Sequence, residues 1–230
     1  MRVLVTRPEP EAITTAAALV RLGHECVLAP VLRIQPVECV APTQRFAAVV
    51  ITSANAVRPG LPGGHGAPLY VVGARTAAAL QRLGHEPPHD VADETQGLVA
   101  ALLRDLPVSA AVLYCAGRDR KSDIEAALRG KGHHVTVLVC YEAEAAISLP
   151  AAVRATLAAG GIEAVLHYSR RSAGIFVNLA EAAGLALALR SLRHLCLSDD
   201  VAVPLRQRQC HDVRIAAQPD EAHLLALLDD

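Results

Sequence analysis

The second half of this chain repeats, in the same order, the short apolar runs and turns of the first half. The matched segments are 3–5 with 112–114, Gly23-His24 with Gly132-His133, 46–57 with 162–173, and 69–103 with 195–228. Unrelated strand–helix units would match at scattered offsets, whereas the offsets here grow steadily along the chain. The sequence therefore predicts a duplicated unit and two domains of like fold.

Each half alternates short apolar runs with Ala-rich segments of helical character. The predicted strands are 3–5, 25–28, 48–51, 69–72, 111–114, 133–139, 164–168, 194–197 and 213–216, and the predicted helices are 11–22, 76–83, 97–106, 124–129, 151–159, 173–183 and 220–228. Hydrophobic residues make up 52% of the chain and aromatic residues only 3%. Small aliphatic side chains at this density are typical of buried parallel sheets covered by helices, so the predicted fold class is α/β.

Charge and targeting signals narrow the function classes. The formal net charge of −1 argues against a nucleic-acid or anionic-membrane binder, because both need a basic surface. No apolar run reaches the roughly 18 residues that span a bilayer, and the opening MRVLVTRPEP predicts a strand instead of a signal peptide. The six cysteines lack CxxC spacing, which favours free thiols in a reducing compartment. We expect a cytoplasmic protein.

Standard catalytic and metal signatures are missing. Ten histidines are present, but neither HExxH nor paired Cys/His spacing occurs, so no metal site is expected. GxGxxG, GxxxxGK[ST] and GxSxG are also absent. His167 is expected to lie in a sheet, and His24, His85 and His133 each follow a glycine, a pattern typical of helix C-terminal turns. A sequence without these motifs fits a reaction in which the enzyme positions its substrate and supplies one weak acid.

The segments that follow the predicted strands are the expected binding loops, because ligands of open parallel sheets bind beyond the carboxyl ends of the strands. These segments are rich in Ser, Thr and Gly and are expected to open helices, whose free amides attract carboxylates or phosphates. The cations in them are Arg7, Arg75, Arg118, Arg120, Lys121, Arg170 and Arg171. As a set they favour a polyanionic ligand of modest size, although helix capping and solvated arginine explain each loop taken singly. A Gly- and Pro-rich segment, 58–68, is expected to be a plain loop.

Five stretches in this order resemble the uroporphyrinogen-III synthase family. They are RVLVTRP, VVITSANAV, YVVGARTAAALQRLGH, LYCAGRDRK and VTVLVCYEAE. The resemblance covers nearly the whole chain, and it implies two similar α/β domains, each a parallel sheet flanked by helices. It implies a discontinuous first domain, 1–35 plus 147–230, and a second domain, 36–146. The segments 32–40 and 140–147 would form a two-stranded antiparallel connector.

The resemblance also implies a reaction. Enzymes of this family close the linear tetrapyrrole hydroxymethylbilane to uroporphyrinogen III, with loss of water and inversion of ring D, in porphyrin and heme biosynthesis. They are lyases and use no cofactor. A pyrrole nitrogen expels the hydroxyl as water to give an azafulvene, and ring closure passes through a spiro intermediate. The expected partners are the substrate and a transient contact with hydroxymethylbilane synthase, and the expected state is a monomer.

By this resemblance, Tyr141 is the candidate acid, since a phenol with a pKa of about 10 is a weak proton donor; the alternative is that Tyr141 only packs the connector. The candidate substrate-binding residues are Arg7, Thr52, Ser53, Ala54, Asn55, Gly73, Thr76, Gly117, Arg118, Tyr168, Ser169 and Ser198.

The second half departs from the family pattern in two places. Ser198-Asp199-Asp200-Val201 stands where the family often has a Gly-x-x-Thr turn, and Tyr168 stands where it often has Thr. Two other classes stay open: a non-catalytic two-lobed module that binds a polyanionic small molecule, and a nucleotide-sugar transferase. The missing diphosphate loop argues against the transferase, and the missing secretion signal and DNA-binding or kinase segment argue against the binding module.

Overall fold

The computed structural model describes residues 1–40, 42–57, 66–120 and 122–229. Lys121 and residues 58–65 of the expected loop lie outside this part of the chain. The chain divides into two compact units. Unit 1 comprises Met1–Arg33 and Glu144–Asp230, and unit 2 comprises Ile34–Ala143. The domain bounds implied by the family resemblance, 1–35 plus 147–230 and 36–146, stay a prediction.

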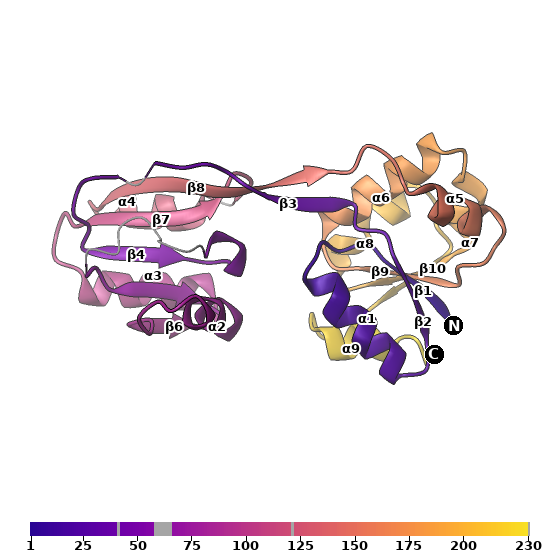
Figure 1. Ribbon diagram of the computed structural model, residues 1–230, viewed down its shortest axis with the longest axis horizontal. Coiled ribbons are helices and arrows are strands. Elements are labelled where there is room, and N and C mark those ends of the chain that lie inside the picture. The colour runs from indigo at the N-terminus through magenta and orange to yellow at the C-terminus, as the bar shows by residue number, and fades with distance from the viewer. Residues whose placement is uncertain (41, 58–65, 121, 230) are drawn as a thin grey trace. The chain divides into compact units, whose positions relative to one another are not determined.

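Unit 1 is built on a five-stranded sheet in the order β11-β10-β9-β1-β2, in which all neighbouring strands are parallel. Its strands are β1 (Arg2–Val5), β2 (Glu25–Leu28), β9 (Ala164–His167), β10 (Arg193–Cys196) and β11 (Asp212–Ile215). Its helices are α1 (Glu11–Arg21), α5 (Ala151–Ala158), α6 (Arg170–Ala182), α7 (Ala186–Ser191), α8 (Asp199–Gln207) and α9 (Glu221–Ala226). The sheet therefore needs both ends of the chain (Figure 1).

Alternating side chains of β1 bury both faces of this sheet. Val3 and Val5 pack with Leu19 of α1 and Leu224 of α9. Leu4 packs on the other face with residues of α5, α6, α7 and α8, and Figure 1 shows α6 and α7 on the side of the strands opposite to α1 and α9. Because successive residues of a strand point to opposite faces, a fully apolar run such as VLV fits only a sheet covered on both sides.

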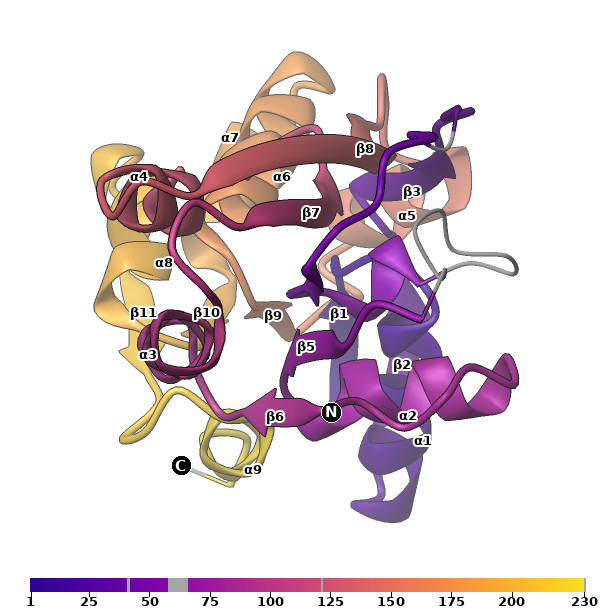
Figure 2. The same ribbon diagram turned by 90° about the vertical axis from the view of Figure 1, so that its left-hand side faces the viewer.

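Unit 2 is built on a six-stranded sheet in the order β3-β8-β7-β4-β5-β6. Its strands are β3 (Leu32–Pro36), β4 (Ala48–Ile51), β5 (Leu69–Val72), β6 (Asp90–Ala92), β7 (Ala111–Gly117) and β8 (His134–Ala145). Its helices are α2 (Ala74–Arg82), α3 (Thr95–Asp105) and α4 (Asp123–Arg129), with a 3₁₀ turn, η1 (Ala54–Ala56). The strands from β8 to β6 are parallel. Figure 2 shows α3 and α4 on one side of these strands and α2 on the other.

The two sheets share one topology. When the strands of unit 1 are taken in the order β9, β10, β11, β1, β2, they occupy the same places in the sheet as β4, β5, β6, β7, β8 of unit 2. The matches seen in the sequence follow this correspondence, for example 3–5 with 112–114 in β1 and β7. The predicted α/β fold with two similar parallel sheets is confirmed, and the repeat is circularly permuted.

The linker strands β3 and β8 are antiparallel. The Val37 amide donates to the Cys140 carbonyl at 3.0 Å, and the Ala146 amide donates to the Val31 carbonyl at 2.9 Å. One residue number rises as the other falls between these two bonds, which is the antiparallel pattern. The connector strands implied by the family resemblance, 32–40 and 140–147, overlap these two elements.

Three Gly-His turns end helices as the sequence predicts. Gly23, Gly84 and Gly132 have φ of +81°, +75° and +86°, and the histidine after each donates its amide to a carbonyl five residues back. This is the left-handed turn that glycine favours at a helix end. By contrast, the prediction that 52–55 opens an α-helix is wrong: among the described residues after β4 only the η1 turn forms, and Val57 is already extended.

Candidate functional site

The candidate residues lie at the carboxyl ends of the strands in each unit. In unit 1, Thr6-Arg7, Tyr168-Ser169 and Ser198 follow β1, β9 and β10. In unit 2, Thr52-Ser53 and Gly73 follow β4 and β5, Gly117 ends β7, and Tyr141 lies in β8 opposite Gly117. Parallel strands end at one edge of a sheet, so each unit gathers its own candidates at one edge.

Tyr141 lies directly against Gly117. A β-carbon built on Gly117 would stand 2.7 Å from Cζ and 2.9 Å from the hydroxyl oxygen of Tyr141, so only glycine leaves room for the ring. The register between β7 and β8 shifts at Ala116/Gly117, and the Arg118 amide donates to the Tyr141 carbonyl at 2.9 Å. The half-buried ring also packs on the core of unit 2.

Tyr114 adds a second phenol that the sequence analysis did not single out. Its side chain is 3% exposed, and its hydroxyl lies 3.1 Å from Oγ1 of Thr52, with either oxygen able to donate. Burial raises the pKa of Tyr114, while the Thr52 hydrogen bond and the charge of Arg120 act in the opposite direction. The predicted binding residue Thr52 is thus joined to a protonated phenol in unit 2.

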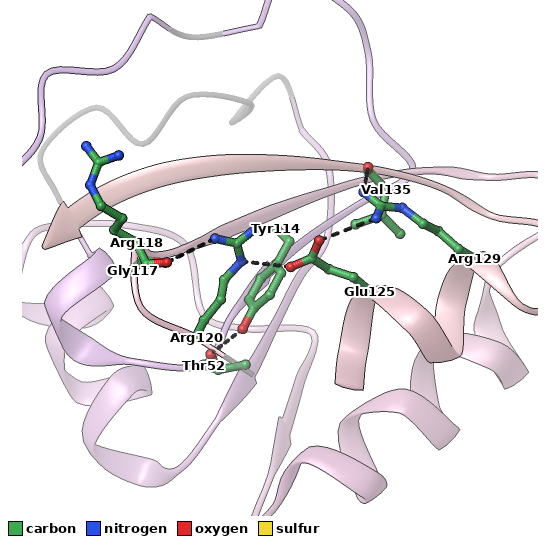
Figure 3. Close-up of polar contacts among 8 residues, drawn as sticks. All are labelled: Thr52, Tyr114, Gly117, Arg118, Arg120, Glu125, Arg129 and Val135. Atoms are coloured by element: carbon green, nitrogen blue, oxygen red, sulfur yellow. Dashed lines mark hydrogen bonds and ion pairs between the residues drawn. The ribbon is translucent and has the colours of Figure 1, made fainter. Parts of the chain in front are cut away.

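Arg120 ties the end of β7 to α4 (Figure 3). Its Nε donates to Oε1 of Glu125 at 2.7 Å, and its Nη1 lies 3.5 Å from the Gly117 carbonyl and 3.3 Å from the Arg118 carbonyl. Glu125 is 7% exposed and also faces Nη1 of Arg129 at 3.5 Å. Arg129 in turn donates from Nη2 to the Val135 carbonyl at 3.0 Å.

The other candidates of unit 2 shape its loops. The Ser53 hydroxyl accepts from the Asn55 amide at 3.2 Å and so opens η1, where Ala54 is half-buried. Gly73, with φ of +82°, donates its amide to the Ala92 carbonyl at 2.8 Å. Thr76 is 4% exposed and donates its amide to the Gly73 carbonyl at 3.0 Å. These contacts fix the backbone at the ends of β4 and β5.

In unit 1, Glu221 of α9 binds three other groups. Its Oε1 accepts from Tyr168 at 2.7 Å, Thr15 at 2.6 Å and Arg7 at 3.2 Å. The Arg7 guanidinium also lies 4.0 Å from the centre of the Tyr168 ring, a distance at which a cation and a ring attract each other. Burial and then the Glu221 contacts raise the pKa of Tyr168, so this phenol keeps its proton.

The remaining candidates of unit 1 cap helices. The Ser169 hydroxyl accepts from the Ser172 amide at 3.1 Å and so begins α6. Ser198 is extended and precedes α8 without a side-chain cap. The carboxylates that follow it are paired: Asp199 with Arg206 at 2.9 Å and Asp200 with Arg170 at 3.0 Å. The departure from the family turn adds two carboxylates, and each of them has an arginine partner within unit 1.

Acidic partners also offset the expected cationic cluster. Arg7 faces Glu221, Arg118 faces Glu142 at 2.6 Å, and Arg120 faces Glu125. Arg75 and Arg171 have interactions of their own, and Lys121 lies outside the described residues. Charge pairs at a surface contribute little to stability, but they reduce the positive field that a polyanion would meet. The predicted binding of a polyanion at these edges would therefore depend more on backbone amides than on these side chains.

The described residues also bear on metal sites and membrane-spanning helices, and one surface hollow of unit 1 lies away from these edges. Across the described ranges, no group of three or more His, Cys, Asp or Glu side chains could hold a metal ion. No described helix is both long and apolar enough to cross a membrane. A surface hollow of about 730 Å³ in unit 1 is lined by Met1, Glu163, Arg193 and Asp212, which lie at the opposite, amino ends of the strands.

The family model for uroporphyrinogen-III synthase HemD matches residues 13–226. The chain belongs to the uroporphyrinogen-III synthase HemD family. A uroporphyrinogen-III synthetase from Helicobacter pylori shares 19% identity with it, over 99% of this chain and 98% of that one, with a TM-score of 0.66. A mutant uroporphyrinogen III synthase from the extremely thermophilic bacterium Thermus thermophilus shares 18% identity, over 100% and 98%, with a TM-score of 0.58. The sequence matches none of the curated proteins compared with it.

Membership in the uroporphyrinogen-III synthase family makes this chain an enzyme of porphyrin biosynthesis that acts on a small molecule. The likeness to the two solved synthases, at such low identity, concerns the fold. The shared fold is of the α/β class, with parallel sheets flanked by helices. The non-catalytic module and the nucleotide-sugar transferase are set aside by the family match.

Sequence reasoning missed four residues of these edges: Thr15, Tyr114, Glu125 and Glu221. Tyr114 ends a predicted apolar strand, and a polar hydroxyl at that position was a usable signal. Glu125 and Glu221 lie in helices, and nothing in their local sequence indicates which strand end they reach. Arg120 was recognised as a loop cation but not as a site residue.

Proposed function

We propose that the enzyme is a lyase that closes hydroxymethylbilane to uroporphyrinogen III, with Tyr141 as the acid. Tyr141 donates its proton to the departing hydroxyl, which leaves as water while the pyrrole nitrogen supplies the electron pair. The proton released when the new pyrrole bond is complete restores the phenol. No cofactor is required by this sequence of steps.

The contact between Tyr141 and Gly117 supports this role for the tyrosine. The ring is held at the carboxyl edge of the unit 2 sheet, where ligands of parallel sheets bind, and Gly117 leaves the room that the ring needs to lie there. Two further phenols, Tyr114 and Tyr168, have raised pKa values through burial, which makes them poorer proton donors.

Backbone amides and hydroxyls at the strand ends would bind the substrate carboxylates. We assign this role to Arg7, Thr52, Ser53, Ala54, Asn55, Gly73, Thr76, Gly117, Arg118, Tyr168, Ser169 and Ser198. Charged ligands gain most from such donors where water is excluded. The proposal also has the enzyme acting as a monomer in the cytoplasm and receiving its unstable substrate by transient contact with hydroxymethylbilane synthase.

The reaction is tested with hydroxymethylbilane generated enzymatically, followed by chromatography of the oxidised products. The proposal predicts the III isomer. Formation of only the spontaneous I isomer in the presence of folded protein would contradict the proposed reaction.

The acid is tested with Tyr141→Phe, which removes only the hydroxyl. We expect turnover to fall about 10²–10⁴-fold, the usual contribution of a positioned acid, with an unchanged unfolding midpoint. The matched control is Tyr70→Phe in the same unit, because the Tyr70 hydroxyl donates to Asp105 near the start of β5, away from the candidate edge. Equal turnover in the two variants would show that Tyr141 is only a packing residue.

A further inference from the structure

Glu125 is an unusual residue for a helix face because it is a carboxylate with only 7% of its surface exposed. Burying an unpaired charge is costly, so such a group persists where partners compensate it. Arg120 donates to it from Nε at 2.7 Å and Arg129 faces it at 3.5 Å. Both partners are arginines, whose rigid guanidinium planes fix direction as well as charge.

Arg120 also contacts the backbone at the end of β7. Nη1 of Arg120 faces the carbonyls of Gly117 and Arg118 at 3.5 and 3.3 Å, so one guanidinium joins α4 to two consecutive carbonyls (Figure 3). The Glu125 carboxylate is the group that holds Nε, and without it the guanidinium would gain rotamer freedom.

The same two residues hold Tyr141. Gly117 touches its ring, and the Arg118 amide donates to its carbonyl at 2.9 Å. A continuous path of contacts therefore runs from Glu125 through Arg120 and the Gly117-Arg118 backbone to Tyr141. Every member of this path belongs to unit 2.

We propose that Glu125 is a positioning residue for Tyr141, acting through Arg120 and the Gly117-Arg118 backbone. The inference rests on the proposed role of Tyr141 as the acid. A displacement of a reacting group by about 1 Å can cost a hundredfold in rate. A small movement of Tyr141 passed along this path of contacts would therefore lower the rate.

The first experiment reads the position of Tyr141 without using activity. The chain has four tyrosines, so ¹³C labelling at the ring Cζ alone gives one NMR signal for each, assigned by a Tyr→Phe variant. In Glu125→Gln we expect the signals of Tyr141 and Tyr114 to shift and those of Tyr70 and Tyr168 to stay. Glu181→Gln is the matched control, since it removes a carboxylate bound to Arg208 at 2.9 Å in unit 1.

An unmoved Tyr141 signal in folded Glu125→Gln would overturn the inference. If that variant does not fold, Arg120→Lys takes its place. Lysine keeps the charge but lacks the planar guanidinium fork that reaches the carboxylate from Nε and the carbonyls from Nη1. The same shift is therefore expected, and its absence in folded protein overturns the inference equally.

The second experiment separates positioning from general stability. Glu125→Gln should lower kcat about tenfold to a hundredfold with KM changed less than about threefold, as expected when a reacting group is displaced and ground-state binding is kept. In a Tyr141→Phe background the same substitution should change kcat less than about twofold, because the acid it positions is gone. An equal loss in both backgrounds would overturn the inference. Unchanged turnover in Tyr141→Phe alone would instead overturn the proposed acid, and the NMR result would still stand.

Discussion

At the scale of single residues, the site is defined by close contacts that forbid substitution. The narrowest is at Gly117, where the Tyr141 ring fills the space that a side chain would need. Atoms that close must move apart, and overpacking in a structured region costs about 1–3 kcal/mol. Tyr141 can therefore take its position only because Gly117 has no side chain.

Gly117→Ala should lower both stability and turnover. We expect the free energy of unfolding to drop by about 1–3 kcal/mol and turnover to fall at least tenfold, because the new β-carbon would lie 2.7 Å from Cζ of Tyr141. Urea unfolding and the isomer assay measure the two effects. Gly174→Ala is the control, since its β-carbon would meet Pro204 at 3.8 Å, an ordinary contact. Wild-type turnover in Gly117→Ala would argue against a fixed ring.

The candidate residues themselves could be predicted only where the sequence places them directly after a strand. Thr52, Gly73 and Gly117 follow or end apolar runs, so their edge could be inferred. Glu125 and Glu221 could not be inferred, because the strand end that a helical side chain reaches depends on how the helix packs. Similarly, the charge pairs that offset Arg118 and Arg120 are tertiary contacts without a local pattern.

At the scale of elements, most strands were predictable because each contains a short apolar run. The predicted bounds 25–28, 48–51 and 69–72 coincide with β2, β4 and β5. Strand β6 and the helices α7 and α8 were not predicted. Strand β6 has only three residues and follows two prolines, and α8 contains Pro204, which argued against a helix. Favourable charges at both ends of α8 offset the proline: Asp199 and Asp200 lie in its first turn and Arg206 in its last turn, where each interacts well with the helix dipole.

The glycine turns at helix ends lead to a matched pair of predictions in unit 2. Gly84→Ala should destabilise by about 1 kcal/mol, because φ of +75° is unfavourable for a residue with a β-carbon. Gly97→Ala should stabilise by up to about 1 kcal/mol, because Gly97 lies within α3 and its β-carbon would meet Ala92 at 3.6 Å. Urea unfolding measures both. If both substitutions changed the free energy of unfolding in the same direction, the predicted difference between the two glycines would be wrong.

At the scale of the whole molecule, the two units share a topology but differ in their buried polar groups. In unit 1, Nε2 of His194 meets the Leu189 carbonyl at 2.8 Å and must donate to it, because a carbonyl only accepts. Its Nδ1 therefore accepts from Nε2 of His167 at 3.0 Å. This leaves Nδ1 of His167 buried without a partner among the described residues. Burial lowers the pKa of both imidazoles, and the neighbouring His194 lowers that of His167 further.

Acid should therefore destabilise unit 1 at mild pH. Since the pKa of both imidazoles is lower in the folded protein than the unfolded value of about 6.5, the unfolded chain binds more protons below that pH. The free energy of unfolding should fall as pH drops from about 6.5, by up to about 1.4 kcal/mol per pH unit for each imidazole. Urea unfolding between pH 7.5 and 5 measures the slope.

His167→Gln should flatten this slope, because the amide still donates to His194 but does not titrate. His211→Gln, which changes an exposed histidine of the same unit, should leave the slope as in the wild type. A slope in His167→Gln equal to that of the wild type would mean that other groups cause the acid sensitivity.

The permuted strand order of unit 1 has a consequence for synthesis on the ribosome. Strands β1 and β2 emerge first, yet β1 needs β9 as its other neighbour, and all of unit 2 is translated in between. At 5–20 residues per second this interval is on the order of ten seconds, and a strand pair alone is marginally stable at best. The pair β1–β2 thus lacks β9 while unit 2 is translated, so the sheet of unit 1 can be completed only after that of unit 2.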